Sequence, residues 1–216
     1  LLWDVLGDRR KVASYNGHAG SIKSIAFADS CHGAKFSSAG LDGLVHEWST
    51  ETGAATNTLR YKDQVCTTHA YHPEHEHFLL AGVGRRIVQW DTRVAGGKVV
   101  REYDGHQGAV THVSMLQGGT RFMSSSVDKT VRTWDTNSSV AVQDFADVTM
   151  HAVPHFAQHP SDGSVAGQSL DNRVIVFAPG KAGKLKLAKD RLPARERNAL
   201  IAAGLVDCAA ACLARS

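Results

Sequence analysis

The sequence predicts an all-β fold, a β-propeller assembled from repeated blades of four short antiparallel strands. The first observation is a period, because strand-closing aromatic residues recur at separations of 45, 42, 44 and 43 residues. The second is that the stretches before them alternate apolar and polar positions around turns rich in Gly, Asp or Asn, which is typical of strands joined by tight turns. A period of about 40–45 residues indicates propeller blades and excludes the shorter helical repeats. The closing residues are Trp3, Trp48, Trp90, Trp134 and Phe177.

The best-preserved repeat opens with Gly105-His106 and closes with RFMSSSVDKTVRTWD, residues 121–135. A Gly-His opening and a Trp-Asp close are the signature of one WD40 blade. Three other stretches align with it around their closing aromatic residue: KFSSAGLDGLVHEW at 35–48, HFLLAGVGRRIVQW at 77–90 and GSVAGQSLDNRVIVF at 163–177. The whole chain therefore reads as repeats of one blade with varying fidelity.

We expect residues 1–190 to form an incomplete WD40 propeller of one half-blade plus about four blades. The expected blades are at about 1–16, 17–59, 60–103, 104–146 and 147–190. Since Trp3-Asp4 already closes a blade, we expect the sequence to begin inside a propeller. Ile22, Ile25 and Phe27 are the expected inward positions of the first strand of the first full blade. Residues 191–216 are Ala-rich and unlike a blade, so we expect a non-propeller tail that is either helical or disordered.

Composition and charge exclude several classes of protein. Hydrophobic content of 43% and charged content of 21% are ordinary for a globular domain. The net charge of +3 comes from a basic segment at 181–197, so direct RNA contact is possible for the protein but is not indicated by the charge of the propeller. That segment has no aromatic residue for base stacking, and an exposed outer strand with its loop explains it better than an RNA site. The apolar stretch 198–214 contains Asp207 and is too short to span a bilayer, so no membrane association is expected.

The four cysteines show no framework of even spacing, so we expect reduced thiols rather than disulfides. Cys208 and Cys212 have the spacing of one helical face, but no second pair of ligands accompanies them. His69, His72, His75 and His77 crowd the segment THAYHPEHEH, for which a metal site and a polar turn stopped by Pro73 are the two interpretations. The irregular spacing favours the turn, and no metal or cofactor is predicted.

Two repeats carry a complete set of four polar or aromatic residues, in which Ser lies ten and Asp six residues before Trp. In WD40 blades such residues form a hydrogen-bonded network that runs from Asp through His and Ser to the indole N–H of Trp. Hydrolase triads use the same three polar types, but recurrence at the blade period favours a structural role, so no catalytic residue is predicted. The two predicted tetrads are His18, Ser38, Asp42 and Trp48, and His106, Ser124, Asp128 and Trp134.

Partner binding is the expected function, because a propeller offers rigid loops on a disc. The candidate partner-binding residues lie beside the turn Asp of three repeats, at Leu41, Val127 and Leu170. No nucleophile elbow, phosphate-cradling Gly motif or paired carboxylate is present. No small-molecule substrate is therefore expected.

Several stretches resemble the pre-mRNA-processing factor 17 family over roughly residues 1–190. The resemblance rests on IVQWDTR (87–93), VVREYDGHQGAV (99–110), RFMSSSVDKTVRTWD (121–135) and the opening LLWDV with RRKVASYNGH. The non-consensus stretches MHAVP (150–154) and QSLDNRVIVF (168–177) are the most specific, because a degenerate blade has no generic reason to share them.

Proteins of this family are nuclear spliceosome components that are associated with the catalytically active complex and needed around the second transesterification, and they are not enzymes. The resemblance implies a WD40 scaffold whose partners are spliceosomal proteins and small nuclear ribonucleoproteins. The alternative is a WD40 adaptor in another pathway, such as a ubiquitin-ligase substrate receptor.

Overall fold

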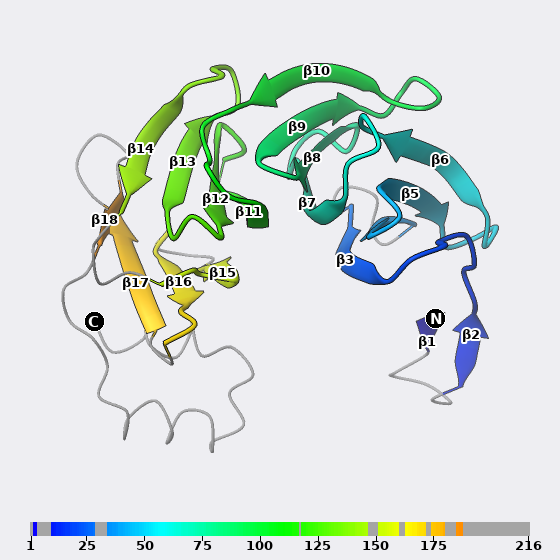
Figure 1. The fold of residues 1–216 in the computed structure, drawn as a ribbon. Coiled ribbons are helices and arrows are strands. Elements are labelled where there is room, and N and C mark those ends of the chain that lie inside the picture. The colour runs from blue at the N-terminus through cyan, green and yellow to red at the C-terminus, as the bar shows by residue number, and fades with distance from the viewer. Residues whose placement is uncertain are drawn as a thin grey trace. The chain divides into compact units, whose positions relative to one another are not determined.

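The computed structural model describes residues 2–3, 10–28, 34–116, 118–146, 151–159, 163–171, 174–179 and 185–187. Every regular element in this part of the chain is a strand, and the strands form one two-stranded and four four-stranded antiparallel sheets (Figure 1). The all-β prediction is therefore confirmed, with four propeller-type blades. The predicted tail 191–216 lies outside the described residues, and the blade boundaries stay a prediction.

Each four-stranded sheet is a meander in which strands consecutive in the chain pair with one another. The two-stranded sheet pairs β1 (Leu2–Trp3) with β2 (Lys11–Ala13). The next two sheets contain β3 (Ile22–Phe27), β4 (Lys35–Gly40), β5 (Leu44–Ser49) and β6 (Ala55–Arg60), then β7 (Cys66–Tyr71), β8 (Phe78–Val83), β9 (Arg86–Asp91) and β10 (Lys98–Tyr103). The last two contain β11 (Val110–Met115), β12 (Arg121–Ser126), β13 (Val131–Asp135) and β14 (Ala141–Phe145), then β15 (His155–Gln158), β16 (Val165–Gln168), β17 (Val174–Pro179) and β18 (Leu185–Leu187).

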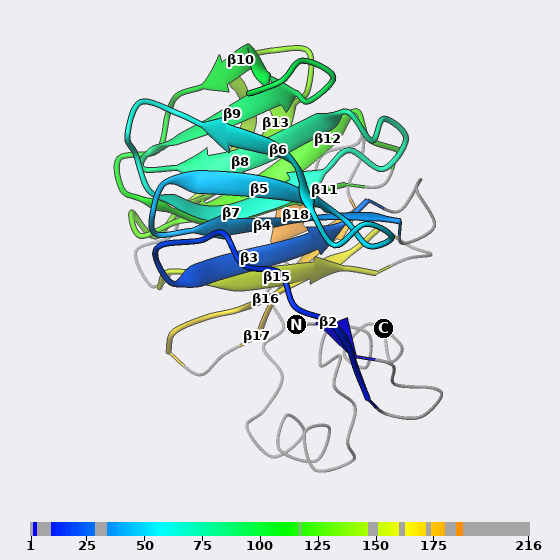
Figure 2. The same cartoon turned by 90° about the vertical axis from the view of Figure 1, so that its right-hand side faces the viewer.

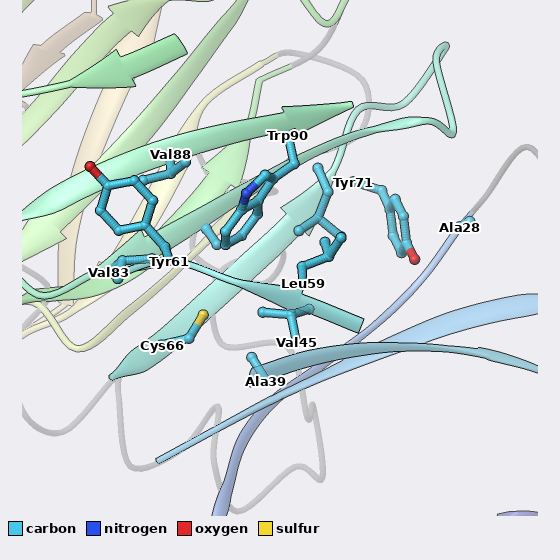
Figure 3. Close-up of a cluster of buried hydrophobic side chains, with 12 residues drawn as sticks. Ala28, Ala39, Val45, Leu59, Tyr61, Cys66, Tyr71, Val83, Val88 and Trp90 are labelled. Atoms are coloured by element: carbon cyan, nitrogen blue, oxygen red, sulfur yellow. The ribbon is translucent and has the colours of Figure 1, made fainter. Parts of the chain in front are cut away.

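The chain divides into two compact units, Leu1–Glu102 and Tyr103–Ser216. In the first unit, β7 packs against β3 and β4, and the buried side chains between the two sheets form a continuous apolar core (Figure 2, Figure 3). Leu59, Leu79 and Trp90 are among its most deeply buried members. The second unit has its own core, which includes Met123, Phe156 and Phe177.

Tight turns between the second and third strands set the register of the first three four-stranded blades. Gly43, Gly84 and Lys129 occupy these turns with φ of 77°, 57° and 66°, a conformation that Gly adopts without steric cost and other residues adopt rarely. The resulting register places Phe36 opposite Trp48 and Phe122 opposite Trp134. Because alternate residues of a strand share a face, Ser38 lies on the same face as Trp48, and Ser124 on the same face as Trp134.

One prediction about the core is wrong. Ile22, Ile25 and Phe27, expected to face inward from the first strand, are 49%, 61% and 48% exposed. At the matching positions of β7, Cys66 and Tyr71 are buried because β4 covers that side of β7. Among the described residues no four-stranded sheet covers the same side of β3, and these side chains instead line a groove of about 460 Å³ together with Leu2, Tyr15 and other residues of the first unit.

Candidate functional site

The first tetrad joins the loop before β3 to the second and third strands of the same blade. His18 lies in that loop, Ser38 on β4, Asp42 in the β4–β5 turn and Trp48 on β5. Nδ1 of His18 is 2.9 Å from Oδ2 of Asp42, and its Nε2 is 2.8 Å from Oγ of Ser38. The indole N–H of Trp48 donates to the same Oγ at 2.9 Å. The network therefore runs through all four residues.

The second tetrad has the same geometry in the β11–β14 blade. Nδ1 of His106 lies 3.0 Å from Oδ2 of Asp128, and its Nε2 lies 2.8 Å from Oγ of Ser124. Trp134 donates its indole N–H to Oγ of Ser124 at 2.8 Å. One assignment of protons is consistent with all three hydrogen bonds of the network. The indole donates to the serine oxygen, the serine hydroxyl donates to Nε2, and Nδ1–H donates to the carboxylate.

The environment keeps the tetrad carboxylates ionised. Burial opposes ionisation of Asp128, but the hydrogen bonds that its carboxylate accepts outweigh burial and lower its pKa to about 2. The donors are the Thr130 hydroxyl and backbone N–H, the Gln107 N–H and His106. Asp42 shows the same balance, in which burial is outweighed by hydrogen bonds from His18 and from the N–H groups of Leu44 and Ala19, so its pKa lies below its usual value.

Burial lowers the pKa of His106, although Asp128 acts in the opposite direction. A neutral imidazole at physiological pH fits the proton assignment above, because Nε2 must accept from the serine hydroxyl. The His106 side chain is 0% exposed and Ser124 is 0% exposed. A nucleophile and base enclosed in this way have no access to a substrate, so the arrangement suits a fixed internal network rather than acyl transfer.

Sequence reasoning missed a partial tetrad in the β15–β18 blade. His151 lies four residues before β15, as His106 lies four before β11, and its Nδ1 is 3.5 Å from Oδ2 of Asp171. The other two positions have changed together, with Gly167 where Ser would stand and Phe177 where Trp would stand. Because phenylalanine has no indole N–H to satisfy, the bridging hydroxyl loses its function. The spacing of His151 from the strand was the available signal.

Two aromatic clusters support the tetrads and were also missed. The Tyr two residues before each Gly-His pair packs edge-on against the aromatic residues of β4 and β5, or of β12 and β13. The ring centroids of Tyr15 are 4.9 Å from Phe36 and 5.6 Å from Trp48. Tyr103 lies 4.8 Å from Phe122 and 5.8 Å from Trp134, and its hydroxyl donates to the carbonyl of Thr136 at 2.9 Å. The Tyr-x-Gly-His spacing in both repeats was the signal.

The four histidines of residues 69–77 occupy different environments. His69 is buried on β7 with Nε2 2.8 Å from Oγ of Ser37, and burial lowers its pKa to about 4. His72 begins the β7–β8 turn and its Nδ1 accepts from the N–H groups of Glu74 and His75, both at 3.1 Å. The segment therefore forms a turn held by His72, and within the described residues no group of three possible metal ligands comes together.

The candidate partner-binding residues lie at one repeated position of the blades. The backbone N–H of Leu41, Val127 and Leu170 donates to the carbonyl of Ser21, Ala109 and Ala152 respectively, in the loop before the first strand of each blade. Their side chains are 43%, 57% and 65% exposed. This bond fixes the backbone while the apolar side chain faces solvent, which makes each position available for contact.

The repeated four-stranded sheets and the two tetrads define the class of protein as one built from WD40 repeats. The family model described as "WD domain, G-beta repeat" matches residues 9–49 and 97–135, the two segments that contain His18 to Trp48 and His106 to Trp134. No helix in the described part of the chain is long and apolar enough to cross a membrane.

The relatives narrow the class. Over 193 residues the chain is 33% identical to pre-mRNA-processing factor 17 of Mus musculus. The aligned residues make up 88% of this chain and 32% of the mouse protein. It is 30% identical over 179 residues to pre-mRNA-processing factor 17 of Saccharomyces cerevisiae, covering 82% and 39%. The target of rapamycin complex subunit LST8 of the same yeast is 28% identical over 131 residues, covering 59% and 41%.

The chain belongs to the pre-mRNA-processing factor 17 family of WD40-repeat proteins. It spans about a third of the length of the mouse and yeast relatives that it matches.

Proposed function

We propose that this chain is a non-enzymatic scaffold in pre-mRNA splicing, acting around the second transesterification through contacts with spliceosomal proteins and small nuclear ribonucleoproteins. The observation that carries the proposal is the similarity to pre-mRNA-processing factor 17 over 88% of the chain. A splicing role also places the protein in the nucleus.

The geometry supports a scaffold rather than an enzyme. The residue types of a hydrolase triad are present, but their hydrogen bonds are used within each blade and the second set is enclosed. What the blades offer to solvent is a set of rigid turns with exposed apolar side chains. We propose that Leu41, Val127 and Leu170 contact protein partners, since each combines a fixed backbone with an exposed side chain.

The test is affinity purification of the tagged native gene product followed by sequencing of the RNA that copurifies. We expect enrichment of the U2, U5 and U6 small nuclear RNAs together with splicing intermediates, relative to a tagged WD40 protein from another complex. Recovery of intact protein without these RNAs would contradict the splicing role. Copurification of ubiquitin-ligase subunits instead would favour the adaptor alternative.

A further inference from the structure

The β7–β10 blade departs from the tetrad pattern in a way that leaves a charged group at its turn. Its β8–β9 turn consists of Gly84 and Arg85, with Val83 paired to Arg86 across it. Gly84 stands six residues before Trp90, where the tetrad blades have Asp, so this turn lacks the carboxylate that accepts from His in those blades. The Arg85 side chain is exposed, and its guanidinium makes no ion pair or hydrogen bond with any residue that the structure describes.

Gln64 and Val65 connect the turn of Arg85 to the β4–β5 turn, which contains Leu41. The N–H of Gly84 donates to the carbonyl of Val65 at 3.3 Å. A Cβ placed on Gly84 would lie 2.5 Å from Oε1 of Gln64, and one placed on Gly43 would lie 2.8 Å from the Gln64 carbonyl. Both turns thus approach Gln64. The Leu41 side chain in the β4–β5 turn is 43% exposed, and Val65, which follows Gln64 in the chain, is 40% exposed.

The other cations near this turn already have acidic partners within the first unit. Nη2 of Arg60 is 2.8 Å from Asp63, while Lys62 and Arg86 lie 3.6 Å and 3.5 Å from opposite oxygens of Glu102. The local charge remains positive, since four cations face two carboxylates. Arg85 is the cation of this group with its hydrogen-bonding capacity open, among the residues described.

We propose that Leu41, Val65 and Arg85 form a docking patch for a short extended peptide segment in which a carboxylate side chain lies next to apolar side chains. A planar guanidinium binds a carboxylate through two parallel hydrogen bonds, and the two apolar side chains provide the surface that a neighbouring leucine-like residue buries. The proposal rests on the scaffold function and names the chemistry of one partner.

The same surface is poorly matched to RNA. Phosphate-backbone binding needs several open cations, whereas three of the four here are paired with carboxylates. Single-stranded bases need exposed aromatic faces for stacking, and Tyr61, the aromatic residue of this loop, is only 5% exposed. The charge and the apolar area together therefore favour an acidic peptide.

Fluorescence anisotropy of the full chain with a labelled peptide of alternating leucine and aspartate tests the proposal. We expect saturable binding that weakens as salt rises, and about a tenfold loss of affinity for Arg85→Gln, equivalent to about 1.4 kcal/mol. Arg85→Lys should lose part of this affinity because an ammonium cannot form the bidentate pair. Leu41→Ser should weaken binding severalfold.

The matched controls are Lys98→Gln and Val140→Ser. Lys98 is at the end of β10 away from Glu102, and Val140 is 72% exposed in the β13–β14 connection. Both variants should bind the peptide as the unchanged chain does. Equal affinity of Arg85→Gln and the unchanged chain would overturn the patch, as would equal loss in the controls. Stronger binding of a labelled oligouridylate with the same dependence on Arg85 would assign the patch to RNA. The splicing role is judged separately by the copurifying RNA, which does not depend on this peptide.

Discussion

Replacing Asp128 by alanine tests whether the tetrad stabilises the blade. Four donors converge on this carboxylate: Nδ1 of His106 at 3.0 Å, the N–H of Gln107 at 2.8 Å, and the N–H and hydroxyl of Thr130 at 2.9 Å and 2.7 Å. Gln107 is exposed and Thr130 partly exposed, so water replaces the carboxylate there. The His106 side chain is 0% exposed, so its Nδ1–H loses the charged acceptor and keeps only the Thr130 hydroxyl oxygen, 3.1 Å away.

The loss of the charged acceptor of one enclosed donor sets the size of the effect. Removing a buried hydrogen bond to a charged group costs about 1–3 kcal/mol, which we therefore expect as the loss in free energy of unfolding for Asp128→Ala. Equilibrium unfolding in urea measures it as a lower midpoint with an unchanged slope. Asp128→Asn keeps an acceptor and should lose less.

The matched control is Asp144→Ala on β14. Asp144 is 50% exposed and 3.7 Å from Nη1 of Arg132, and an ion pair whose carboxylate is this open to solvent contributes roughly 0–1 kcal/mol. If Asp128→Ala and the unchanged chain unfold at the same urea concentration, the network does not stabilise the blade and the reasoning from burial fails.

Three further outcomes follow from the structure. Burial lowers the pKa of His69 and of His112 to about 4. The unfolded chain therefore binds more protons than the folded chain between about pH 6.5 and 4, and we expect the free energy of unfolding to fall as the pH is lowered through this window. The fall should be shallower for His112→Gln. Gly167→Ser, which restores the tetrad serine, should destabilise the β15–β18 blade by about 1–3 kcal/mol in urea unfolding, because its Cβ would lie 2.8 Å from Cγ1 of Val153; a gain in stability would contradict this. Burial raises the pKa of the Cys66 thiol to about 12. Mass spectrometry should therefore find Cys66 unlabelled by N-ethylmaleimide at pH 8 in the folded chain and labelled after unfolding. Rapid labelling of the folded chain would contradict the burial of Cys66.

The residues of the tetrads were predictable because their spacing is dictated by strand geometry. In each tetrad, Ser lies ten residues and Asp six residues before Trp, and two paired strands joined by one tight turn require these separations. Residue type and spacing together therefore determine the network. His151 was missed because its partners Ser and Trp are replaced by Gly167 and Phe177, and an incomplete set carries too little pattern to recognise.

The amino-acid sequence by itself determined the all-β class, the blade period, the tetrad residues and the family, because all of these depend on local spacing and residue type along one chain. Only the tertiary structure decided which apolar residues are covered and which cations are paired. Ile25 alternates as a core residue should, yet it is 61% exposed because nothing described packs on that side of β3. Arg85 is one of many exposed basic residues in the sequence, and it stands apart only because its neighbours Lys62 and Arg86 share Glu102. Burial and pairing depend on which sheets and loops meet, and the pattern of a single repeat does not contain that information.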